Sequence, residues 1–346
     1  IERKKKIWII NFLPIIKDAD GNYKKVLTFD VEVVFLQQVG KKSTLKVSGI
    51  HQYASSSVLA NGKWVKIRVP SSGIYKLTYS DLLAMGISNP SNPRIFGYGG
   101  AMLPEDFSKS KIDDLPEVPI WMEKGNDGIF NTGDYILFYA QGHVSWELSA
   151  NNTDFVHIVN PYSKYGYYFV TSDAGEGKKI SLAPVLEEIP TNNVDYFLDY
   201  QLRENDLVNM VKSGREWFGE EFNTTTQRSF SFSFPNIYSA LSAVLVADVI
   251  ATSSVASSFS VYANNVQLGT NINIPRVSTS GYEKAKQANA KFSFTPNKDD
   301  ITILLQYNKS TNTSTARLNY LRLNAYRELK MTDNTLFFRN PSVIAQ

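Results

Sequence analysis

A turn-rich segment between two apolar runs carries the oxygen-bearing side chains best suited to bind a metal ion. With Gly128 placed at the glycine of a calcium-binding loop, four of them fall at the first, fifth, ninth and last positions of that loop. Calcium takes about six to eight oxygens, however, and Gly125 holds the third position. The flanking segments also have the pattern of strands. A plain turn is the favoured interpretation, and the alternative is a calcium site at Glu123, Asp127, Asn131 and Asp134.

Catalytic residue types are present without the spacing that catalysis needs. The histidines at positions 51, 143 and 157 show no metal-ligand spacing, and no cysteine or serine nucleophile motif accompanies them. Acidic residues in segments 111–117 and 203–206 resemble the paired carboxylates of a glycosidase, but such pairs are common in loops. We therefore predict no catalytic residue in this chain.

Residues 97–102 form a glycine-rich run that resembles a dinucleotide-binding turn. Met102 stands where the last glycine is needed, and Pro104 prevents a helix from following closely. We interpret the run as a turn between strands.

Residues 214–222 alternate charged and aromatic side chains between glycines, which indicates a fixed loop. We expect Arg215 to pair with a nearby acid, at Glu216, Glu220 or Glu221. One interpretation is a brace between two domains, and the other is a surface that contacts a partner. Because interfaces are enriched in aromatic residues and arginine, the candidate partner-binding residues are Arg215, Trp217 and Phe218.

Composition limits the class of protein. The 346 residues suffice for two domains with real cores, and 43% hydrophobic content is globular. A formal charge of +3 gives no support for nucleic-acid binding. The sequence has no cysteine, so a thiolate metal site or a cysteine nucleophile within the chain is excluded. No apolar run approaches the roughly 20 residues of a membrane helix. The chain begins at Ile1, its opening lacks a signal-peptide cleavage site, and we expect it to be part of a longer protein.

The elements that must position these residues are predominantly strands. Residues 117–141 predict a central hairpin: residues 118–122 alternate, and residues 135–140 are apolar on both faces, as in a central strand. Residues 5–16 and 24–37 predict another hairpin around a turn at residues 18–22.

Between these hairpins, residues 64–69 and 74–78 predict a strand and its return strand, joined by a turn at residues 70–73. Ser80 is the expected cap of a short helix that ends before Gly86. Further strands are predicted at residues 94–103, 157–159 and 165–171.

The second half of the chain has the pattern of a β-sandwich. Residues 196–211 show helical or irregular spacing, and six short strands follow. We predict an all-β fold with a few short helices and two β domains, at residues 1–190 and 195–330. The second is a jelly-roll-like sandwich, and residues 331–346 form an extended tail. The six sandwich strands are expected at residues 229–234, 240–251, 258–266, 290–295, 301–307 and 315–326.

Many short motifs, among them Gly125-Asn-Asp-Gly-Ile-Phe-Asn-Thr-Gly-Asp-Tyr and Ser213-Gly-Arg-Glu-Trp-Phe-Gly-Glu, follow one another in a specific order along nearly the whole chain. In this order the chain resembles the non-catalytic N-terminal region of the PorU family. These proteins are gingipain-like cysteine endopeptidases that act as sortases of the type IX secretion system in Bacteroidetes. The other motifs lie at residues 58–67, 72–79, 95–100, 114–120, 135–140, 160–163, 167–169, 318–324 and 338–341.

The resemblance implies an exported protein at the bacterial cell surface or outer membrane. Its parent would cleave C-terminal sorting signals from secreted cargo and attach the cargo to surface lipopolysaccharide. The implied partners are a downstream peptidase domain of the same protein, an outer-membrane barrel protein and the cargo. Because the family's catalytic His and Cys lie in that downstream domain, no catalytic residue is carried over to this chain. The tail would lead toward it.

Two other functions remain open. A carbohydrate-binding or cell-surface adhesion module would use aromatic platforms on the sandwich, but no tryptophan follows Gln227. A self-contained hydrolase would need a catalytic pair that the sequence does not show.

Overall fold

The structure is a computed structural model that describes residues 15–17, 20–25, 27–28, 53–106, 108–109, 111–185, 193–278 and 281–340. The chain divides into two compact units, Ile1–Tyr53 and Ala54–Gln346. In the first unit, β1 (Ile15–Lys17) pairs antiparallel with β2 (Tyr23–Lys25), which confirms the hairpin around residues 18–22. Of the remainder of both predicted strands, only residues 27–28 are described, and they are not in a strand. The other residues and His51 lie outside the described residues. The predicted division at residue 190 stays a prediction.

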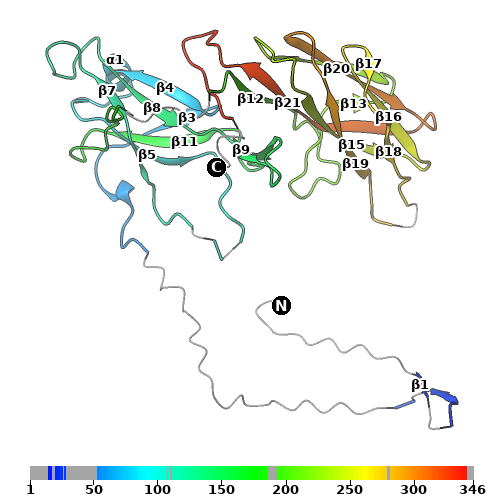
Figure 1. The fold of residues 1–346 in the computed structure, drawn as a ribbon. Coiled ribbons are helices and arrows are strands. Elements are labelled where there is room, and N and C mark those ends of the chain that lie inside the picture. Colours follow the sequence, from blue (N-terminus) through cyan, green and yellow to red (C-terminus); the bar gives the residue numbers. More distant parts are fainter. Residues whose placement is uncertain are drawn as a thin grey trace. The chain divides into compact units, whose positions relative to one another are not determined.

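The part of the second unit before residue 186, here called the first lobe, contains three antiparallel sheets in its described residues, one of them a two-stranded hairpin (Figure 1). The other two sheets enclose a common core that includes Ile95, Ile136 and Phe138. One sheet has the order β3 (Val65–Val69), β11 (Gly166–Thr171), β5 (Arg94–Gly99) and β6 (Glu117–Val118). The other has the order β4 (Gly73–Thr78), β8 (Tyr135–Ala140) and β7 (Trp121–Glu123).

The predicted central hairpin is formed by β7 and β8, with Trp121 opposite Leu137 and β8 in the middle of its sheet. Its first strand is shorter than predicted, because Glu117–Val118 belongs to the other sheet and pairs with β5. Pro119 has no N–H to donate to a ladder, so the strand breaks there. The N–H of Ile120 then bonds the carbonyl of Lys178 at 3.0 Å.

The predicted pairing of residues 64–69 with residues 74–78 is wrong, although both strands exist. β3 pairs with β11, and β4 pairs with β8. Both strands bury alternate side chains, and the chain passes from one sheet to the other between them. At this crossing the hydroxyl of Ser72 accepts a hydrogen bond from the N–H of Gly142 at 3.1 Å.

Two short helical elements lie in the first lobe: the 3₁₀ turn η1 (Val58–Ala60) and the helix α1 (Tyr79–Ala84). The N-cap of α1 is Thr78 and not Ser80. Thr78 Oγ1 accepts from the N–H of Asp81 at 3.0 Å, and Asp81 Oδ2 accepts from the N–H of Thr78 at 2.9 Å. This reciprocal capping box satisfies two backbone donors, which a cap at Ser80 would not do. Gly86 follows the helix with φ of 89°, as predicted.

Residues 196–328 form a β-sandwich of two antiparallel sheets around one core, which confirms the predicted fold class (Figure 1). The structure has a strand at each of the six predicted sandwich positions. One sheet has the order β12 (Tyr196–Glu204), β21 (Thr315–Glu328), β15 (Ala243–Thr252) and β19 (Lys286–Phe294), with β13 (Glu221–Phe222) paired to β21. The other has the order β14 (Gln227–Ser233), β20 (Asp300–Asn308), β16 (Ser257–Ala263) and β17 (Val266–Gln267), with β18 (Ile272–Ile274) paired to β16.

The helical or irregular structure expected at residues 196–211 is wrong for residues 196–204, which form the strand β12. Adjacent residues Phe197 and Leu198 are both buried, with 1% and 3% of their surface exposed. A strand that is covered on both faces loses the alternation that identifies strands in a sequence. The final segment also lies along this strand: the N–H of Leu198 donates to the carbonyl of Arg339 at 3.1 Å.

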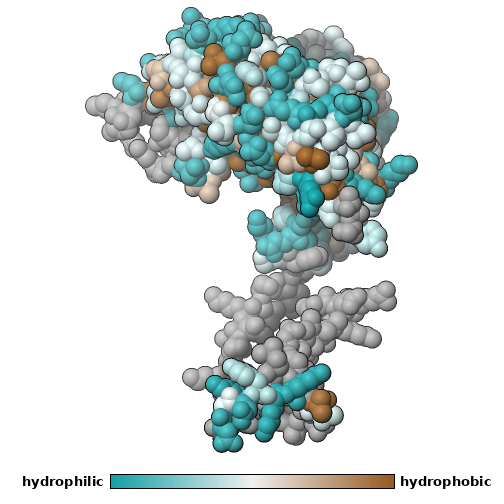
Figure 2. Space-filling model, turned by 90° about the vertical axis from the view of Figure 1, so that its right-hand side faces the viewer, coloured by the Kyte–Doolittle hydropathy of each residue, from teal (hydrophilic) through white to brown (hydrophobic). Residues whose placement is uncertain are grey.

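The surface gives little indication of a binding face by hydropathy alone. On the face drawn in Figure 2, hydrophobic residues are scattered among hydrophilic ones rather than gathered in a broad patch. None of the helices in the described ranges is long and apolar enough to cross a membrane.

Gly166 occupies a position where two backbones approach each other too closely for a side chain. A Cβ there would lie 2.1 Å from the carbonyl oxygen of Gln141 and 3.0 Å from the N–H nitrogen of Gly100. We expect Gly166→Ala to destabilise the fold by about 3 kcal/mol or more, because neither contact is with a flexible side chain.

The matched control is Gly73→Ala, because no atom lies within 4 Å of the Cβ position at Gly73. This change should alter stability by less than about 1 kcal/mol. Urea unfolding followed by circular dichroism compares the two variants. Equal stabilities would show that the backbones can separate at Gly166.

Candidate functional site

The hairpin formed by β9 (Val144–Leu148) and β10 (Phe155–Val159) lies on the outer face of the β12-containing sheet. Its anchor is Asn324 of β21, which is 1% exposed. Asn324 Oδ1 accepts from the N–H of Phe155 at 2.7 Å, and Asn324 Nδ2 donates to the carbonyl of Phe155 at 3.2 Å. One side-chain amide thus satisfies both backbone groups of a buried residue on the hairpin.

A buried ion-pair cluster stands beside this anchor. The carboxylate of Asp154 is 4% exposed, and it lies 3.0 Å from Lys291 Nζ and 3.7 Å from an Arg322 nitrogen. Burial by itself raises the pKa of Asp154. Hydrogen bonds from Lys291, Ser149 and Thr153 outweigh it, so that the pKa is lowered. The ionised carboxylate therefore holds the hairpin to two cations of the sandwich.

Aromatic side chains fill the rest of the contact. Trp146 stacks on Tyr200 with ring centroids 4.1 Å apart, and Phe155 meets Tyr200 edge to face at 4.9 Å. His157 packs against Tyr320, and its Nε2 lies 3.3 Å from Glu204 Oε2. The hairpin and the sandwich therefore share one continuous layer of rings.

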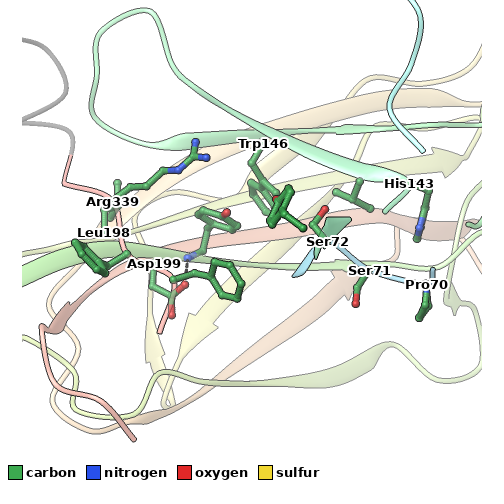
Figure 3. A pocket seen from close by; sticks show the side chains of 13 residues that line it. Pro70, Ser71, Ser72, His143, Trp146, Leu198, Asp199 and Arg339 are labelled. Carbon is green, nitrogen blue, oxygen red and sulfur yellow. Dashed lines mark hydrogen bonds between the residues drawn. The ribbon is translucent and has the colours of Figure 1, made fainter. Parts of the chain in front are cut away.

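A cavity of about 460 Å³ opens on one side of the hairpin. Figure 3 shows Pro70, Ser71, Ser72 and His143 at one end, Leu198, Asp199 and Arg339 at the other, and Trp146 between them. Exposed rings of Tyr139, Phe337 and Phe338 also line it. Asp199 is engaged by Arg327 at 2.8 Å, whereas no described residue pairs with the guanidinium of Arg339. The cavity combines aromatic walls with few polar groups, as ligand pockets do.

A second cavity, of about 440 Å³, lies on the other side of the hairpin and includes two of the predicted partner-binding residues. Arg215 forms an ion pair with Glu105 of the first lobe, and not with Glu216, Glu220 or Glu221. We expected an acid close in sequence to pair with Arg215, but the loop directs the Arg215 side chain toward the first lobe. This contact is the one that the brace interpretation predicts. Glu220 and Glu221 pair instead with Arg203 and Arg317.

The other two predicted residues differ from each other in exposure. Trp217 is 41% exposed at the rim of this cavity, so it is available to a partner. Phe218 is 7% exposed, and its backbone pairs with Val208 in both directions, at 2.8 and 3.0 Å. The structure therefore leaves Arg215 and Trp217 at the surface and gives Phe218 a packing role. Partner binding at these residues stays a prediction.

The acidic loop consists of turns in which the carboxylate oxygens accept hydrogen bonds from groups of the loop itself. Asp127 Oδ1 accepts from the N–H of Ile129 at 2.9 Å, which lowers the Asp127 pKa, and its Oδ2 accepts from Asn131 Nδ2 at 2.7 Å. Asp134 Oδ2 accepts from the N–H of Asn131 at 2.8 Å. Glu123 ends β7, opposite Tyr135. In the described part of the chain, no three His, Asp or Glu side chains form a cluster for a metal ion. A calcium site here stays a prediction.

The remaining sequence motifs have structural surroundings. Glu117 forms a two-pronged ion pair with Arg94, at 2.7 and 2.9 Å. In segment 203–206, burial and the neighbouring Glu204 raise the pKa of Asp206. Gly99 and Gly100 approach the backbone of the β8–β9 connection so closely that any Cβ would lie 2.7 Å from it. This packing explains the glycine-rich run without a phosphate ligand.

No protein-family model and no curated protein matches the chain. Among solved structures, dimeric latent PorU from Porphyromonas gingivalis has a TM-score of 0.72 and 30% sequence identity. The match covers 83% of this chain and 26% of that chain. The resemblance to PorU is confirmed at the level of the fold. The chain spans about a quarter of the length of the PorU chain that it matches.

Two further structures are similar only at much lower TM-scores. A family 36 carbohydrate-binding module in complex with calcium and xylotriose has a TM-score of 0.24 and 13% identity, with 36% of this chain and 98% of that chain covered. The insecticidal delta-endotoxin Cry8Ea1 from Bacillus thuringiensis has a TM-score of 0.26 and 12% identity, with 68% and 42% covered.

Asp154 makes the contact between hairpin and sandwich dependent on pH. Its pKa is lowered in the folded chain, so its contribution is present above the unfolded value of about 3.9 and is lost as pH falls through the folded value. We expect Asp154→Asn to cost about 2 kcal/mol or more at pH 7. The difference from the unmodified chain should shrink below about pH 4.

Urea unfolding at neutral and acid pH measures this difference. The control is Asp333→Asn, which changes an exposed carboxylate and should leave stability unaltered at both pH values. A loss of stability in Asp154→Asn that does not depend on pH would contradict the assigned role of the charge.

Proposed function

We propose that this chain is the non-catalytic N-terminal region of a type IX secretion sortase of the PorU family. In this role it supports a cysteine-peptidase domain of the same protein and docks partners at the bacterial cell surface. The parent protein would cleave C-terminal sorting signals from cargo and attach the cargo to lipopolysaccharide. The observation that carries the proposal is the fold shared with PorU over 83% of the chain at 30% identity.

The chain's own chemistry supports a docking role over a catalytic one. Its sequence has no cysteine, so the nucleophile of such a peptidase would belong to another part of the polypeptide. The second cavity presents an exposed Trp217 beside the Arg215–Glu105 ion pair. Tryptophan and arginine are the side chains that most often dominate binding energy at interfaces. We therefore place the docking surface at this cavity, between residues 102–105 and residues 215–217.

The direct test measures binding of the purified chain to two candidates: the peptidase domain and the outer-membrane barrel protein of the same organism. We expect Trp217→Ala to weaken binding to at least one of them by tenfold or more, as truncation of a central aromatic anchor does. Arg215→Ala should weaken the same interaction. Surface plasmon resonance gives the dissociation constants.

The control for this test is Tyr282→Ala, which removes an exposed ring from the sandwich away from the second cavity. Binding that is insensitive to Trp217→Ala and Arg215→Ala, but present, would move the docking surface elsewhere. No binding to either candidate would refute the docking role itself.

Glycan binding is the alternative, and the aromatic cavity favours it. Trp146 of the first lobe lines this cavity together with Tyr200 of the sandwich, so the lobe contact supplies a tryptophan that the sandwich sequence lacks. A glycan array would decide. Saccharide binding that Tyr139→Ala abolishes would support this alternative, because Tyr139 is half-exposed at the cavity wall.

A further inference from the structure

A buried carboxylate on the outer face of the sandwich is surrounded by side-chain amides. Asp248 of β15 is 3% exposed. Its Oδ1 lies 2.7 Å from Gln287 Nε2 and 3.1 Å from Asn319 Nδ2, and its Oδ2 lies 3.4 Å from Asn289 Nδ2. Burial raises the Asp248 pKa despite these hydrogen bonds. The ionised form is therefore under-compensated by its neighbours, all three of which are neutral.

The backbone is shaped to assemble this group. Asn289 stands directly opposite Asp248 in the ladder between β15 and β19. On the other side, Asp248 pairs with Tyr320 and the next residue pairs with Leu318, so Asn319 is the extra residue of a β-bulge. The bulge turns Asn319 to the same face as Asp248, where a regular strand would have pointed it into the core.

The positive charges of this face are engaged elsewhere. Lys291 and Arg322 both stand opposite Val246, one row along the sheet from Asp248, and both are directed to Asp154. Glu216 lines the second cavity together with Asn319, and its charge further raises the Asp248 pKa. In the described part of the chain, no side chain pairs with the carboxylate of Glu216. A second carboxylate therefore lies near the first, and two neighbouring negative charges attract a cation.

The structure assigns a divalent-cation site to Asp248, Gln287, Asn289 and Asn319, with Glu216 from the loop at residues 214–222. We infer that the cation is calcium. Half a turn of each amide about its last bond exchanges nitrogen for oxygen with little change in shape. The contacts of 2.7, 3.1 and 3.4 Å then become spacings between oxygen atoms. Such spacings suit neighbouring oxygens that share a cation at about 2.3–2.6 Å.

Calcium is the cation that this donor set selects. All five side chains offer oxygen, which excludes metals that prefer nitrogen or sulfur. Magnesium requires near-ideal octahedral geometry at about 2.0–2.1 Å, whereas calcium accepts irregular sets and completes its shell with water. Gln287 and Asn289 lie on the exposed edge strand β19, which gives water and the ion a path inward. With three neutral ligands, we expect a dissociation constant on the order of 0.1–1 mM.

The site joins the sheet to the segment that carries Arg215 and Trp217, because Glu216 stands between them in the chain. Calcium bound at Asp248 would fix this loop. The inference rests on the sandwich geometry alone and does not depend on the proposed function.

The test titrates the full 346-residue chain with calcium chloride at constant ionic strength, using isothermal calorimetry and thermal unfolding. We expect saturable binding and a rise in Tm of about 2–3 °C at tenfold excess over the dissociation constant. Terbium bound in place of calcium should show luminescence sensitised by Tyr320 and Trp217. Magnesium should bind at least tenfold more weakly.

The decisive variant is Asn289→Lys, which places an ammonium group on the exposed strand opposite Asp248. It should abolish calcium binding and raise the Tm of the calcium-free chain, because the tethered cation replaces the ion. Asp248→Asn and Asn319→Ala should weaken binding tenfold or more. If Asp248→Asn fails to fold, Asn289→Lys still decides.

The matched control is Asp127→Asn in the acidic loop, which should bind calcium as the unmodified chain does. Absence of any calcium-dependent signal at about 10 mM overturns the proposal, since extracellular modules bind in the range of 0.1–1 mM. Loss of binding in Asp127→Asn with retention in Asn289→Lys also overturns it, and places the ion in the acidic loop.

Discussion

The contact on which the rest of the structure depends is the pair of hydrogen bonds between Asn324 and the backbone of Phe155. A β-hairpin laid on the face of a sheet brings buried backbone groups that need partners. Asn324 provides a donor and an acceptor in one planar group, and Asp154 beside it is compensated by Lys291 and Arg322. The apolar rings around these groups exclude water, which strengthens the polar contacts that they surround.

This contact changes the character of the sheet beneath it. An outer sheet of a sandwich normally has one solvated face, but here β12, β15 and β21 bury side chains on both faces. Both cavities, and the candidate surface at Arg215 and Trp217, lie at the margins of the covered area. The features that could bind a ligand thus arise from the incomplete fit of a hairpin against a twisted sheet.

The sequence predicted the elements whose environment is regular. Strands such as β14 and β20 alternate because one face meets the core and the other meets water, and they were found near their true limits. β12 was missed because the hairpin covers its outer face, so no alternation remains. Pairing was less predictable than strand positions. Nothing in residues 64–78 distinguishes a hairpin from a crossing between two sheets, because both bury alternate residues.

The surroundings of the candidate residues could be predicted only where local chemistry determines them, and their role in binding a partner stays a prediction. Trp217 could be selected as a partner-binding candidate from its residue type, and it is exposed. Phe218 beside it is buried by a backbone pairing with Val208 that leaves no trace in the local sequence. Arg215 forms an ion pair with Glu105, which is 110 residues away in the chain. The group around Asp248 was missed for a similar reason, since its members come from three strands and depend on a β-bulge at Asn319.

The two buried carboxylates on this face of the sheet, Asp154 and Asp248, have different partners. Lys291 and Arg322 flank Val246 in one cross-strand row, and the carboxylate of Asp154 descends from the hairpin onto that row. In the next row, Asn289 and Tyr320 flank Asp248, and neither carries a positive charge at neutral pH. The two rows lie about 7 Å apart, because two residues along a strand separate them. The two cations of the first row could therefore pair with Asp248 only if their side chains were free to turn toward it. Asp154 holds them. The carboxylate in the second row is left with amide dipoles, which orient toward a charge but do not neutralise it. A sheet face that pairs one buried acid with two fixed cations, and surrounds the next with oxygen-bearing amides, has the charge arrangement that a mobile cation completes.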